Sequence, residues 1–98
     1  MMSQFMVEFA LEEFTEEFIR KVPLQRQKVN ELMEEGKILA YSLASDRSKL
    51  WCVVKAKDEF EVMGIVSDFP LIDYMTPNIS ELMFNNIVAL RIPLMSLN

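Results

Sequence analysis

The chain has 98 residues, which is enough for one domain over residues 1–98 with a single hydrophobic core. Apolar residues make up 51% and charged residues 26%, a globular composition, and the net charge of −5 argues against a basic surface for nucleic acid or anionic lipid. No apolar run approaches the roughly 20 residues of a membrane span, and no basic, apolar leader is evident. We therefore expect a cytoplasmic protein that binds neither nucleic acid nor membrane.

Cys52 is the single cysteine, and the chain contains no histidine. A lone cysteine without a histidine partner indicates a structural thiol in a reducing compartment. Without histidine, the commonest general base and metal ligand is missing, and haem ligation is disfavoured. The acidic run over residues 12–17 lacks the spacing of a calcium loop. We expect no metal and no cofactor.

The first predicted element is a strand over residues 3–11, apolar on both faces apart from Glu8. Over residues 14–35 the apolar residues recur at spacings of three, four and seven residues, which is typical of an amphipathic helix. Thr15 is its expected N-cap, and Gly36 closes it. Pro23 removes one intrahelical hydrogen bond and predicts a kink or a split into two helices.

A β-hairpin follows, with strands predicted over residues 37–44 and 50–57 around a polar turn. Asp58, with Glu61 three residues later, predicts the start of a short helix. A fourth strand is expected over roughly 78–84, with Pro77 at its entry because proline cannot donate to a central ladder. The order β-α-β-β-α-β predicts an α+β, ferredoxin-like fold with both helices on one face of an antiparallel sheet.

The strands contain more apolar residues than the one sheet face covered by the helices can bury. We expect the second face to be buried by another copy of the chain, sheet against sheet, which gives a dimeric α/β barrel. The tail over about 85–98 is apolar, and we expect it to pack on a partner subunit. The expected assembly is a homodimer or a larger ring.

Three segments resemble muconolactone isomerases and their relatives. They read Phe5-Met6-Val7-Glu8, Leu32-Met33-Glu34-Glu35-Gly36-Lys37 and Phe69-Pro70-Leu71-Ile72-Asp73-Tyr74-Met75, and the Pro-Leu-x-x-Tyr-Met run is the most specific. The resemblance implies a ferredoxin-like subunit that forms a dimeric α/β barrel and often larger rings. It also implies a pocket between sheet and dimer partner, where a proton is moved on a small unsaturated lactone without metal or cofactor.

The strand after Gly36 departs from the pattern of this family. Relatives carry Arg-His and Trp-Arg there, whereas this chain reads Ile38-Leu39-Ala40-Tyr41-Ser42-Leu43. This strand therefore contains no counterpart of the histidine and arginine residues that relatives carry. Glu8 remains, at a place where relatives often show an acidic residue, together with Tyr74.

Glu8 is the candidate catalytic base, because a carboxylate on a buried strand is desolvated and becomes a better base near neutral pH. Tyr41 or Lys55 would stabilise an enolate oxygen if their strands bring them to the same face as Glu8. The alternatives are that Glu8 pairs with a lysine or lies at a wet strand end, and that Lys55 snorkels from its strand. Aromatic residues at strand spacing are also often simply core. The residues expected to line the pocket are Trp51, Tyr74 and Leu39.

Two functions remain open at this point. The first is binding of a small organic molecule, with cofactor-free acid–base isomerisation of an organic acid or lactone. The second is a non-catalytic binding or assembly module that kept the fold while Leu39, Tyr41 and Leu43 filled its pocket. A dry pocket of roughly 300 Å3 beside Glu8 would favour the first function, and the absence of any cavity there larger than a few waters would favour the second.

Overall fold

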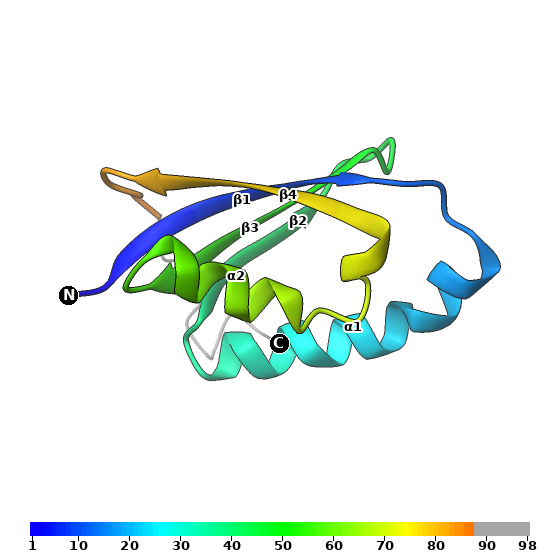
Figure 1. Ribbon diagram of the computed structural model, residues 1–98, viewed down its shortest axis with the longest axis horizontal. Helices are drawn as coiled ribbons and strands as arrows, with labels where there is room; N and C mark the ends of the chain where they lie inside the picture. The colour runs from blue at the N-terminus through cyan, green and yellow to red at the C-terminus, as the bar shows by residue number, and fades with distance from the viewer. Residues whose placement is uncertain (88–98) are drawn as a thin grey trace, which may run out of the picture.

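The computed structural model describes residues 1–87. Its elements are β1 (Ser3–Leu11), α1 (Glu16–Glu34), β2 (Ile38–Leu43), β3 (Lys49–Ala56), α2 (Glu59–Ser67), the 3-10 helix η1 (Ile72–Tyr74) and β4 (Met75–Leu82). The strands form one antiparallel sheet in the order β2-β3-β1-β4. Both helices lie on the same face of the sheet (Figure 1). The predicted α+β, ferredoxin-like fold is confirmed.

The predicted helix ends are also present. The Thr15 hydroxyl accepts a hydrogen bond from the Phe18 amide at 3.2 Å and caps α1. Gly36 follows α1 with φ of +75°, a conformation that glycine adopts without a Cβ clash. The Asp58 carboxylate accepts from the Glu61 amide at 2.8 Å and caps α2.

The alternative of a split helix at Pro23 and the predicted place of Pro77 both differ from the structure. Pro23 neither splits nor ends α1, which runs as one helix of 19 residues. Pro23 lies on the exposed side of α1, where water can solvate the carbonyl that lost its partner. The last strand begins at Met75, so Pro77 lies inside it and not at its entry. β4 is an edge strand, so one of its sides has no neighbouring strand. Proline, which lacks a backbone N–H donor, is tolerated at such an edge.

The face of the sheet toward the helices holds the core. Phe5, Val7 and Phe9 of β1 are buried, and their cross-strand partners on β3 are Val54, Cys52 and Leu50. The helices complete this core from the other side; their buried apolar residues are Phe18, Val29, Leu32, Val62 and Val66.

The opposite face of the sheet, here the open face, carries Met6, Glu8, Trp51, Val53, Asn78 and Ser80 by strand register. Val53 is only 4% exposed, but polar side chains surround the apolar ones. The open face therefore mixes apolar and polar residues, to which β4 contributes Asn78 and Ser80.

A β-bulge in β2 decides where Tyr41 lies. The register shifts between Ile38 and Ala40, so that Tyr41 pairs with Cys52 and Ser42 with Trp51. Cross-strand partners share a face. Tyr41 therefore lies on the helix side of the sheet, and Ser42 lies on the open face.

The expectation for the apolar tail concerns residues that lie, from 88 onward, outside the described part of the chain. Within residues 1–87, none of the helices combines the length and the apolar character needed to cross a membrane.

Candidate functional site

A pocket of about 440 Å3 lies between α1 and the helix side of the sheet. We call it the α1–sheet pocket. Its walls are largely apolar; they comprise Leu11, Phe14, Phe18, Val22, Val29, Met33, Leu43, Leu50, Leu71 and Met75. Its polar lining residues are Gln25, Arg26, Asn30 and Tyr41. The volume and the apolar lining with few polar groups are typical of small-molecule sites, which span roughly 300–1,000 Å3.

Gln25 and Tyr41 form the polar centre of this pocket. Gln25 is only 3% exposed, and its Oε1 accepts a hydrogen bond from the Leu71 amide at 3.1 Å. Its Nε2 donates to the Tyr41 hydroxyl oxygen, also at 3.1 Å. One side chain of α1 therefore holds both the phenol of β2 and the loop after α2 in place.

The Tyr41 hydroxyl and the Cys52 thiol, on the helix side of the sheet, stay neutral at physiological pH. Burial raises the pKa of the Tyr41 hydroxyl, and the hydrogen bond from Gln25 offsets part of that increase. Burial raises the pKa of the Cys52 thiol to about 12. Tyr41 is therefore a hydrogen-bond donor and not a base, and Cys52 is not a nucleophile at neutral pH.

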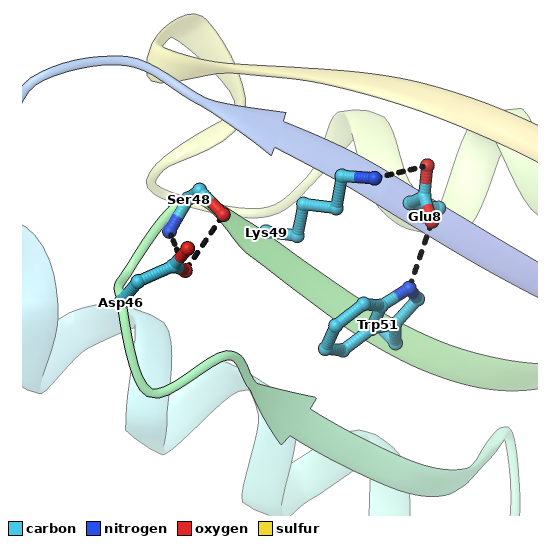
Figure 2. A network of polar contacts seen from close by, with 5 residues as sticks. All are labelled: Glu8, Asp46, Ser48, Lys49 and Trp51. Atoms are coloured by element: carbon cyan, nitrogen blue, oxygen red, sulfur yellow. Dashed lines mark hydrogen bonds and ion pairs between the residues drawn. The ribbon is translucent and has the colours of Figure 1, made fainter.

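A second hollow, of about 480 Å3, lies on the open face and is lined by Met6, Glu8, Ser42, Trp51, Asn78 and Ser80. The Trp51 indole Nε1 donates to Glu8 Oε1 at 2.9 Å, and the Lys49 ammonium lies 3.7 Å from Glu8 Oε2 (Figure 2). The Glu8 side chain is half-buried. Both of its oxygens are thus engaged, which agrees with the alternative that Glu8 pairs with a lysine.

The structure separates the residues expected to act together. Glu8 and Trp51 share the open-face hollow, whereas Tyr41 lies on the other face of the sheet. In one chain Tyr41 therefore cannot stabilise an enolate formed by Glu8, because the sheet lies between them. Lys55 is exposed on the open face, opposite Gln4 and away from Glu8 in the register.

The two remaining candidate pocket residues line neither hollow. Leu39 lies at the β-bulge of β2. Tyr74 packs its ring edge-on against Phe18, with centroids 5.6 Å apart, and so supports the pocket wall from behind. Tyr41 and Leu43, two of the β2 side chains expected to fill a pocket, line the α1–sheet pocket and leave about 440 Å3 open.

Within residues 1–87, no cluster of three or more cysteine and acidic side chains is placed to hold a metal ion. The polar groups of the α1–sheet pocket are an amide, a phenol, a guanidinium and a second amide. This donor set suits an organic ligand better than a cation, which needs carboxylate, thiolate or imidazole ligands.

Residues 4–84 match the family model described as muconolactone delta-isomerase. The match covers more than four fifths of the chain. The chain belongs to the muconolactone delta-isomerase family. A search of curated proteins finds no match. The predicted resemblance is thereby confirmed, and the residues of both hollows fall inside the matched range.

The most specific motif behind the muconolactone delta-isomerase resemblance has a structural role in this chain. Leu71 and Met75 of this motif line the α1–sheet pocket. The Leu71 backbone amide donates a hydrogen bond to Gln25 Oε1. Tyr74 of the same motif packs on Phe18. The motif thus builds one wall of the pocket and fixes the orientation of Gln25.

Sequence reasoning missed Gln25. Glutamine in an amphipathic helix usually lies on the solvated face, so its residue type alone does not indicate a site. A signal was present, however, because Phe18, Val22, Val29 and Leu32 leave one gap in the apolar stripe, and Gln25 occupies it. A polar residue inside the buried stripe of a helix needs a hydrogen-bond partner and can mark a site.

Proposed function

We propose that this member of the muconolactone delta-isomerase family binds a small, largely apolar organic molecule in the α1–sheet pocket. The observation that carries the proposal is an apolar cavity of about 440 Å3 with one buried, oriented polar pair, Gln25 and Tyr41. Small-molecule sites share this combination of apolar walls and a few placed polar groups.

The same pocket favours binding over isomerisation. Moving a proton requires a base within hydrogen-bond reach of the carbon acid. Among the described residues that line the pocket there is no carboxylate, and Tyr41 stays protonated at neutral pH because burial raises its pKa. This supports the non-catalytic alternative, with one difference. The chain keeps an open pocket, but none of the described residues that line it can act as the base.

We further propose that the open face receives a second copy of the chain and that the subunits form an α/β barrel. Val53 at the centre of this face is already 4% exposed, and Met6 and Trp51 flank it. In the described strands, Glu8 is the single acidic residue that the register places there, beside Lys49 and Lys55. A chain of net charge −5 can thus meet its own copy on this face with little repulsion.

The binding proposal predicts an effect of filling the pocket. Met33 lies at the pocket and is 40% exposed, and Met63 on α2 is 42% exposed and lies outside it. We expect Met33→Trp to weaken binding of an uncharged acyl-aminonaphthalene dye about tenfold or more, because the indole occupies the cavity. Fluorescence titration measures this.

Met63→Trp is the matched control and should bind the dye as the unsubstituted chain does. Equal dye affinity in both variants, or no binding to the unsubstituted chain, would contradict the proposal.

A second candidate function rests on the open-face hollow. Glu8 is a carboxylate beside a cavity of about 480 Å3, which a partner subunit would enclose. Acid–base isomerisation of a small organic acid or lactone would then use Glu8 as the base. The hydrogen-bond donor to the enolate oxygen would come from the interface between the two subunits. If a ligand binds there, Glu8→Gln abolishes turnover and Met6, which lines the hollow, contacts the ligand.

A further inference from the structure

The direction of the Gln25–Tyr41 hydrogen bond can be assigned from its neighbours. An amide oxygen and an amide nitrogen are hard to distinguish by shape alone. The Leu71 backbone amide can only donate, so the Gln25 atom that it meets at 3.1 Å must be the oxygen. The nitrogen Nε2 then faces Tyr41 and donates to its hydroxyl oxygen.

This assignment leaves the Tyr41 O–H hydrogen free. A phenol accepts at its oxygen and donates through one hydrogen, and Gln25 uses only the acceptor side. In the part of the chain that the structure describes, the Tyr41 hydroxyl takes part in one side-chain hydrogen bond, as the acceptor from Gln25, and in none as a donor. Tyr41 lines the α1–sheet pocket, so this donor is available to a ligand inside it.

The charge of the pocket limits which acceptor fits. Its inner walls are aliphatic or aromatic, and the one charged lining residue, Arg26, lies at the solvent-exposed rim of α1. A buried anion needs several donors or a counter-charge, and a single phenol does not supply them. A neutral oxygen needs only the one donor that Tyr41 offers.

From these three observations we propose that the α1–sheet pocket selects an uncharged, ring-sized carbonyl compound. Its C=O oxygen accepts the hydrogen bond from Tyr41, and its ring packs between Phe18 of α1 and Leu50 of β3. The pocket discriminates against a carboxylate of the same shape. This inference rests on the binding function proposed above and names the ligand class of that site.

Three ligands of one shape test the proposal. Methyl naphthyl ketone carries the acceptor, isopropenylnaphthalene replaces its oxygen by a methylene group, and naphthoate replaces the acetyl group by an anion. We expect the ketone to bind the full-length chain about tenfold more tightly than the alkene, the fold-change that one net hydrogen bond gives. Naphthoate should bind more weakly than the ketone. Competition with the naphthalene dye measures all three affinities.

Tyr41→Phe removes only the donor and should bring the affinities for ketone and alkene together. Thr76→Val is the matched control, because it removes a hydroxyl from the exposed side of β4, outside the pocket lining, and should leave the preference intact. The inference is overturned if the unsubstituted chain binds ketone and alkene equally, if the preference survives in Tyr41→Phe, or if naphthoate binds most tightly. If none of the three binds, the binding function itself fails, and the inference fails with it.

Discussion

Gln25 shows how one side chain can join separate parts of this small fold. It lies in the buried stripe of α1, accepts from the backbone after α2 and donates to Tyr41 on β2. A buried amide that satisfies both partners stabilises a single arrangement, whereas an unsatisfied one costs about 1–3 kcal/mol. The pocket therefore has a fixed polar centre in an otherwise apolar interior.

Cys52 provides a test at the scale of a single residue. The pKa of its thiol is about 12 in the folded chain against 9.0 for an ordinary thiol, because burial disfavours the thiolate. Between pH 9 and 12 the unfolded chain has lost this proton and the folded chain keeps it, so the free energy of unfolding falls as the pH rises. We expect a loss on the order of 2–3 kcal/mol between pH 9 and 11.

Urea unfolding at several pH values measures that loss. Cys52→Val keeps a buried apolar side chain of similar size on β3 and should remove this part of the alkaline destabilisation. Tyr41, whose pKa is also raised by burial, contributes in the same direction at higher pH and remains in the variant. An unchanged pH dependence in Cys52→Val would contradict the assignment.

At the scale of elements, the sequence was sufficient for the order of helices and strands. The short apolar runs of β1 and β3, the period of α1 and the caps at Thr15 and Asp58 each have a local cause that sequence patterns record. These features depend on neighbours along the chain, so they can be predicted without knowing the tertiary structure.

The features that escaped prediction depend on contacts between elements. The bulge after Ile38 turns Tyr41 to the helix side, and nothing in the sequence of β2 reveals it. The sequence predicts Pro77 before the last strand, because the position of β4 at the sheet edge depends on the order of the strands. The candidate site was affected in the same way, since the separation of Glu8 from Tyr41 follows from the register of three strands.

At the scale of the whole molecule, the barrel proposal predicts how the chain assembles. Ser80 is exposed on the open face, two residues from Asn78 and close to Glu8 in the register. We expect the unsubstituted chain to sediment as a dimer or a multiple of it. Ser80→Glu should shift it toward monomer, because like charges then meet across the seam. Sedimentation equilibrium measures both.

Ser45→Glu in the exposed turn between β2 and β3 adds the same charge away from the seam. It should assemble as the unsubstituted chain does. A monomeric unsubstituted chain, or identical behaviour of both variants, would contradict a seam at the open face.

The methionines allow the proposed binding site to be located directly. Met33 and Met75 line the α1–sheet pocket, whereas Met6 lines the hollow beside Glu8. In a chain with isotope-labelled methionine methyl groups, titration with methyl naphthyl ketone should shift the NMR signals of Met33 and Met75 and leave that of Met6 unchanged. Shifts confined to Met6, or none at saturating ketone, would contradict binding in the α1–sheet pocket.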